Sequence, residues 1–163
     1  MYSRIVVPLD GSEAAEAALT HAIAIARLSG ATVHLVRVVD DSWITRYGIL
    51  GLPIASDSAG EILSEETTDA RTYLATMRER LEKTGIPVTA ELREGIAADE
   101  IRAATKSGDL IAIATHGRSG LSRLAMGSVA EDVARHTDTP VLLCRTSPHV
   151  ANENGAVHVN HAS

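Results

Sequence analysis

An acid-free segment in the second half of the chain carries the residue types that bind phosphate. Residues 110–130 contain no Asp or Glu, although the 163-residue chain has 21 acidic residues and a formal net charge of −6. Free main-chain N–H groups in a glycine-rich loop, the positive end of a helix dipole and arginines all favour a bound anion. We therefore interpret as a phosphate-binding loop the segment that holds Thr115, His116, Gly117, Arg118, Ser119, Gly120, Arg123, Gly127 and Ser128.

Three common motifs are missing from the sequence. A P-loop has the pattern G-x-x-x-x-G-K-[ST], with four residues between its glycines and a lysine after the second. Here six residues separate Gly120 from Gly127, and no lysine follows. The turn after the first apolar run, residues 8–12, lacks the glycines of a dinucleotide fingerprint. A G-x-S-x-G nucleophile elbow is missed by one position near Ser119. Most kinases, NTPases, dehydrogenases and esterases are thereby excluded.

Composition restricts the class further. The chain is 45% hydrophobic and 22% charged, as in ordinary globular domains, but it has one Trp, three Tyr and no Phe. An acidic chain with scattered basic residues and few aromatics disfavours nucleic acid as the partner. Cys144, the single cysteine, lies in an apolar run and is expected to be a buried, inert thiol. With no targeting or membrane-spanning segment, we expect a soluble cytoplasmic protein.

Hydrophobic periodicity predicts one α/β domain over residues 1–146. Strands and helices alternate, apart from an unusually long loop at 40–57, and the tail at 147–163 has the composition of a disordered segment. The pattern predicts five strands, at 4–8, 31–39, 88–93, 110–114 and 140–145. It also predicts four helices. The first starts near Glu13 and ends before Gly30, and the others lie at 58–84, 98–106 and 128–136.

Strands that alternate with helices form a parallel, doubly wound sheet through right-handed crossovers. The first and fourth strands are the most continuously apolar, so we expect them to be central neighbours. The result is a five-stranded, Rossmann-like sheet in the order 3-2-1-4-5, with helices on both faces. Ligands bind where the winding reverses, outside the carboxyl ends of the strands. Asp10 and the phosphate-binding loop would face each other there.

The last strand raises the question of a partner. In this order it lies at the edge of the sheet, yet from Pro140 it stays uncharged until Arg145. An apolar exposed edge invites pairing. We predict a homodimer through residues 140–145; a covering helix or tail of the same chain is the alternative.

The sequence resembles the universal stress protein family of adenine-nucleotide-binding α/β proteins. The family signature is G-x-x-G, nine residues, then G-[ST]; here it falls on residues 114–117, 118–126 and 127–128. The similarity extends through residues 5–12, 33–40, 127–131 and 139–143, which is most of the chain. One position departs from the signature, because Ala114 replaces its first glycine. An alanine fits if this residue ends an extended strand, but costs about 1–2 kcal/mol if a positive φ is required.

Carried over by position, the resemblance implies ATP, ADP or AMP in the crevice. Asp10 would meet the ribose or adenine, with Pro8 and Val38 as the apolar wall around the base. His116 and Gly117 would contact ribose and phosphate, and Gly127, Ser128 and Val129 would donate to the phosphates. Arg118 and Gly120 would contact the terminal phosphate. Ile113 and Ala114 are the other nucleotide-binding positions that the resemblance implies. Mg²⁺ or Mn²⁺ would be held by phosphate oxygens, since no carboxylate cluster forms a protein metal site.

Several of these residues also have purely structural interpretations. Asp10 with Glu13, and Ser128 with Glu131, have the spacing of helix capping boxes. His116 is alternatively a loop histidine with satisfied hydrogen bonds. His34 lies in a strand pattern, where a structural role is expected.

Three functions fit the sequence. The first is a dimeric, nucleotide-binding stress or energy-status regulator that signals to a protein partner and hydrolyses ATP slowly or not at all, because no evident general base faces an attacking water. The second is a nucleotide-free dimeric interaction module, which Ala114 favours. The third is an adenylyl-transferring enzyme using the 40–57 loop as a substrate pocket.

Overall fold

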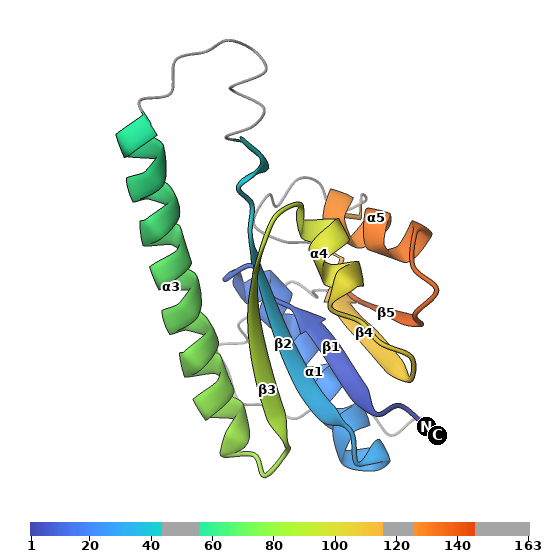
Figure 1. Cartoon of the computed structure of the whole chain (residues 1–163). Helices are drawn as coiled ribbons and strands as arrows, with labels where there is room; N and C mark the ends of the chain where they lie inside the picture. Colours follow the sequence, from blue (N-terminus) through green and yellow to red (C-terminus); the bar gives the residue numbers. More distant parts are fainter. Residues whose placement is uncertain (44–55, 116–125, 146–163) are drawn as a thin grey trace, which may run out of the picture.

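The computed structural model describes residues 1–43, 56–115 and 126–145 and consists of one parallel sheet between two helical layers (Figure 1). The sheet has five strands in the order β3-β2-β1-β4-β5, which confirms the predicted topology. In chain order the elements are β1 (Arg4–Pro8), α1 (Glu13–Ser29), β2 (Thr32–Val39), α3 (Ser56–Glu82), β3 (Val88–Glu94), α4 (Ala97–Ala103), β4 (Asp109–Ala114), α5 (Ser128–Arg135) and β5 (Val141–Cys144). The 147–163 tail and most of the 40–57 loop lie outside the described residues.

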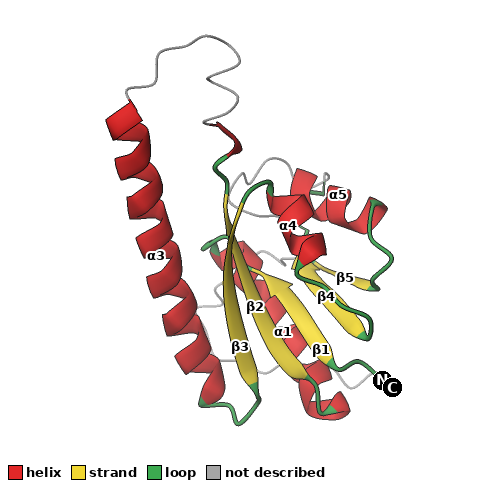
Figure 2. Ribbon diagram, viewed as in Figure 1, coloured by secondary structure: helices red, strands yellow, loops and turns green. Residues whose placement is uncertain are grey.

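Helices cover both faces of the sheet, as predicted (Figure 2). Alternation along each strand sends successive side chains to opposite faces. Ile5 and Val7 join one core with α1 and α3, whereas Val6 joins a second core with α4 and α5. Both cores consist almost entirely of Ala, Val, Ile and Leu, because the chain has so few aromatic residues.

The edge strands differ in exposure from the central ones. Every residue of β4 is buried, whereas β3 is mostly half-exposed or exposed, as its alternating sequence predicted. At the other edge β5 is shorter than the predicted 140–145, and Leu143 is 40% exposed. The helix boundaries agree with the sequence to within three residues, and Gly30 ends α1 in a left-handed conformation (φ 71°) that suits glycine. Cys144 is buried, and burial raises the pKa of its thiol.

An ion pair between a half-buried arginine and a buried aspartate joins the two central strands at their amino ends. Arg4 of β1 and Asp109 of β4 are register partners, and the guanidinium donates to both carboxylate oxygens at 3.1 and 2.6 Å. The same guanidinium reaches the carbonyl of Ala104 at 3.0 Å, and the Lys106 N–H donates to Asp109 at 2.8 Å. Burial opposes ionisation of Asp109, but the Arg4 and Lys106 hydrogen bonds prevail and lower the pKa of its carboxyl.

Arg4→Met is expected to lower the free energy of unfolding by about 3 kcal/mol, because it leaves the buried Asp109 carboxylate without its cation. Urea denaturation of the variant measures the loss. The matched control is Arg78→Met, which breaks an exposed pair with Glu82 on α3 and should cost no more than about 0.5 kcal/mol. Equal losses in the two variants would contradict the importance of burial.

Candidate functional site

A cavity of about 270 Å³ opens at the carboxyl ends of β1 and β4, where the winding of the sheet reverses. Its volume is close to the lower end of the range of small-molecule sites, about 300 Å³. Eight of the predicted site residues line it together: Pro8, Asp10, Val38, Ile113, Ala114, Gly127, Ser128 and Val129. The other four, His116, Gly117, Arg118 and Gly120, lie outside the described residues.

Six further lining residues were not predicted from the sequence: Leu9, Ala15, Val36, Ala97, Ile101 and Ala130. Three of these positions had a readable signal. Val36 shares the face of Val38 because strand side chains repeat every two residues. Ala97 and Ile101 are four residues apart at the start of α4 and therefore share one helical face. The other three, Leu9, Ala15 and Ala130, reach the cavity through the way α1 and α5 pack on the sheet, which no local pattern shows.

The cavity is apolar on one side and polar on the other. Val36 and Val38 of β2, Ile101 of α4 and Ile113 of β4 provide the apolar wall. The polar side consists of Asp10 in the β1–α1 turn and the first turn of α5. Such a cavity suits a ligand with a flat apolar part and an anionic part.

Local hydrogen bonds decide which groups of the α5 terminus are available. Gly127 is the N-cap, and its N–H donates to the Thr115 carbonyl at 2.7 Å, so this N–H has an acceptor within the protein. The N–H groups of Ser128, Val129 and Ala130 begin the helix and have no intrahelical acceptor. The capping-box interpretation of Ser128 is wrong, because the N-cap of α5 is Gly127 and Ser128 is the first helical residue.

Asp10 shapes the turn that follows β1. Its Oδ1 accepts hydrogen bonds from the N–H of Ser12 at 2.9 Å and from the Ser12 hydroxyl at 2.6 Å. The N-cap of α1 is Ser12, whose hydroxyl accepts from the Ala15 N–H at 3.1 Å. Helix capping by Asp10 is therefore wrong, and its carboxylate instead lies at the cavity wall while fixing the turn.

Ala114 ends β4 as an extended, buried residue. A β conformation is open to any side chain, so the alanine brings no backbone strain at this position of the motif. The interpretation of Ala114 as a strand residue is confirmed.

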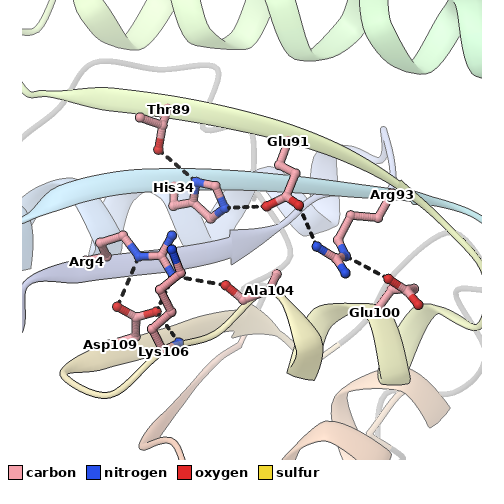
Figure 3. A network of polar contacts seen from close by, with 9 residues as sticks. All are labelled: Arg4, His34, Thr89, Glu91, Arg93, Glu100, Ala104, Lys106 and Asp109. Carbon is pink, nitrogen blue, oxygen red and sulfur yellow. Dashed lines mark hydrogen bonds and ion pairs between the residues drawn. The ribbon is translucent and has the colours of Figure 1, made fainter.

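A chain of polar contacts fixes α4 beside the cavity (Figure 3). His34 of β2 contacts Thr89 at 2.7 Å through Nδ1 and Glu91 at 3.1 Å through Nε2. Arg93 donates to Glu91 and, at 2.7 Å, to Glu100 of α4. His34 is 6% exposed and has the structural role that its strand position predicted. Burial lowers the pKa of His34, and the Glu91 hydrogen bond opposes that effect only in part.

The fold and the position of the cavity can now be set beside known proteins. The sequence model described as the universal stress protein family matches residues 1–145. The chain belongs to this family. Among curated members, universal stress protein MJ0531 of Methanocaldococcus jannaschii is 37% identical over 149 residues, which is 89% of this chain and 83% of the relative.

Solved universal stress proteins share the fold. The structure of MJ0577 from the same archaeon matches with a TM-score of 0.75 at 29% identity, covering 91% of this chain and 99% of that protein. A universal stress protein of Archaeoglobus fulgidus, solved in complex with dAMP, matches with a TM-score of 0.58 at 23% identity, covering 87% and 97% of the two chains. This second match shows the common fold only.

Within the described ranges no three His, Cys, Asp or Glu side chains gather where they could hold a metal ion. No helix in this part of the chain combines the length and apolarity that crossing a bilayer requires.

His34→Asn is expected to flatten the dependence of stability on pH. Because burial lowers the pKa of His34 in the folded state, protonation favours unfolding. Its contribution to stability is present above the unfolded pKa of about 6.5 and is lost as the pH falls through the folded value. Urea denaturation between pH 7.5 and 5 measures this loss.

The matched control is His21→Asn, on the exposed face of α1. It should retain the parent's fall in stability below about pH 6.5. An identical fall in His34→Asn would show that His34 does not contribute to it.

Proposed function

We propose that this universal stress protein binds an adenine nucleotide, ATP or its ADP or AMP counterpart, in the cavity between β1 and β4. The observation that carries the proposal is the cavity's division into an apolar wall and the exposed first turn of α5. The base would lie against Val36 and Val38, Asp10 would contact the ribose or the base, and the phosphates would meet the amides of residues 128–130.

Electrostatics supports the same orientation. The chain is acidic overall, yet residues 110–130 carry no carboxylate, so no side chain of this segment itself repels an anion. The dAMP complex of the A. fulgidus protein places a nucleotide in another member of the family, and the proposal for this chain rests on its own cavity. A divalent cation, Mg²⁺ or Mn²⁺, would be coordinated by phosphate oxygens and water.

We further propose a regulatory role in the cytoplasm, signalling to a protein partner, without rapid catalysis. Asp10 is the only titratable side chain among the described cavity-lining residues, and its Oδ1 already accepts two hydrogen bonds within the turn. A general base must hold an attacking water within hydrogen-bond reach, and this arrangement supplies none among those residues. Hydrolysis of ATP is expected to be slow or absent.

ATP with Mg²⁺ should raise the melting temperature of the parent protein, because a ligand that binds only the folded state stabilises it. Gly127→Val should abolish this rise, since a branched side chain at the N-cap occupies the space next to the first α5 turn. Calorimetric titration with ATP and differential scanning fluorimetry measure the two effects. Mass spectrometry of the freshly purified protein reports a bound nucleotide directly.

Gly127→Ala is the graded control. Gly127 has φ −60°, which alanine adopts freely, and an added Cβ would lie 3.4 Å from the Thr115 carbonyl, an ordinary contact. This variant should fold normally and retain part of the stabilisation. No stabilisation of the parent, together with no nucleotide in the purified protein, would refute binding and leave the nucleotide-free interaction module as the function.

We also propose that β5 forms the interface of a homodimer, across residues 140–145. The strand lies at the sheet edge, and its exposed Leu143 is flanked by the half-buried Leu142. Edge pairing with a second copy would satisfy the outer main-chain groups and cover these side chains.

Leu143→Asp is expected to convert the dimer to a monomer, because it introduces a charge at the centre of the proposed interface. Analytical ultracentrifugation measures the change in mass. Ile62→Asp, at a 54% exposed apolar residue of α3, is the control and should leave the mass unchanged. A monomeric parent would contradict the proposed interface.

A further inference from the structure

One buried cation lies next to the nucleotide cavity without lining it. Arg37 belongs to β2 and is 7% exposed. Its neighbours Val36 and Val38 line the cavity, so strand alternation directs the Arg37 side chain to the opposite face of the sheet, the face covered by α1 and α3. Burial of an arginine is costly, and such a residue commonly has a specific role.

The guanidinium lies directly beneath the turn that carries Asp10. Gly11 has φ +84°, and a Cβ at this position would be 2.8 Å from Nη1 of Arg37 and within 4 Å of both Cζ and Nη2. The guanidinium therefore lies against the turn at Gly11, with Nη1 nearest to it. Any side chain at Gly11 would displace it, apart from the strain of a positive φ.

The other side of the guanidinium faces α3. Cζ of Arg37 is 5.5 Å from the centre of the Tyr73 ring, within the range of a cation–π contact. The Tyr73 hydroxyl donates to Glu16 at 3.2 Å, and Glu16 is paired with Arg80 at 2.8 Å. The guanidinium is thus held between the turn and a tyrosine that is itself hydrogen-bonded.

The charges at this place act on one another. Burial raises the pKa of the Tyr73 hydroxyl, the Glu16 and Asp10 carboxylates raise it further, and the Arg37 cation opposes them. These contributions require that Asp10 and Arg37 both lie within electrostatic range of the same hydroxyl. The turn thus lies next to the cavity through Asp10 and next to the Arg37 guanidinium through Gly11.

We propose that Arg37 is a positioning residue of the nucleotide site, which supports the Asp10–Ser12 turn from behind and holds the Asp10 carboxylate toward the ribose or base. This inference rests on the proposed function. Arg37 itself does not touch the ligand, and it acts through Asp10. Its removal therefore affects the nucleoside end of the ligand and leaves the phosphate end unchanged.

A double-mutant cycle tests the dependence on Asp10. Calorimetric titration with ATP–Mg²⁺ compares the parent with Arg37→Met, Asp10→Asn and the double variant. Arg37→Met should weaken binding about tenfold, and the double variant should bind about as weakly as Asp10→Asn alone, because both changes remove one interaction. Additive losses would overturn the proposal.

Inorganic triphosphate with Mg²⁺ is the second probe. Its affinity should be the same in the parent and in Arg37→Met, since this ligand has no nucleoside for Asp10 to contact. Equal weakening of triphosphate and ATP would overturn the proposal in favour of a general structural or electrostatic effect. Arg37→Lys should recover only part of the ATP affinity, because an ammonium keeps the charge but lacks the guanidinium that lies against Gly11.

The matched control is Arg80→Met, which removes a neighbouring cation that is paired with Glu16. It should leave the affinity for ATP unchanged. A tenfold loss in Arg80→Met would overturn the assignment of the effect to Arg37.

Hydrogen exchange of the nucleotide-free protein separates this proposal from the proposed function. The N–H groups of Ser12 and Ala15 are hydrogen-bonded within the turn, to Asp10 and Ser12 respectively. Arg37→Met should accelerate their exchange several-fold while the amides of β4 stay protected. Unchanged exchange at both would overturn the positioning role, whether or not the parent binds ATP. If Arg37→Met accelerates exchange but the parent binds no nucleotide, Arg37 does support the turn, and only the nucleotide-binding function is refuted.

Discussion

The parallel pairing of β1 with β4 is the constraint on which the rest of the structure depends. From β1 the chain turns through α1 to β2 on one side, and from β4 it turns through α5 to β5 on the other. Right-handed crossovers in opposite directions must lie on opposite faces of the sheet. The chain therefore leaves β1 and β4 toward opposite faces, and a cavity lies at the carboxyl ends of these two strands.

Two kinds of group meet at this cavity because of that geometry. The strands contribute branched apolar side chains such as Val38 and Ile113, and the start of α5 contributes main-chain amides. The ion pair of Arg4 with Asp109 joins the same two strands at their amino ends. The pairing of β1 with β4 is therefore stabilised by its buried apolar side chains and, at the amino ends, by this ion pair. The site is thus a consequence of the sheet order, and its chemistry comes from the residues at the ends of the elements.

Much of the fold was predictable because its signals are local and repeated. The continuous apolar runs of β1 and β4, the alternation in β3 and the stop of α1 at Gly30 are all features of neighbouring residues. The helix starts were less predictable. Both Asp10 and Ser12 have side chains that can cap a helix. The N-cap of α1 is Ser12 because a tertiary contact prolongs the extended chain beyond β1: the Leu9 N–H donates to the Val36 carbonyl at 2.8 Å.

The sequence by itself determined the family, the strand order and most of the described cavity-lining positions, since motif spacing and apolar periodicity are properties of short segments. Only the tertiary structure decided which groups at those positions remain available: the Gly127 amide is bonded to Thr115, whereas those of Ser128 and Val129 begin a helix. It also brought Arg37 beneath Gly11, 26 positions earlier in the chain. Contacts of this kind depend on how β2 packs against the β1–α1 turn, and no pattern along a single segment encodes that packing.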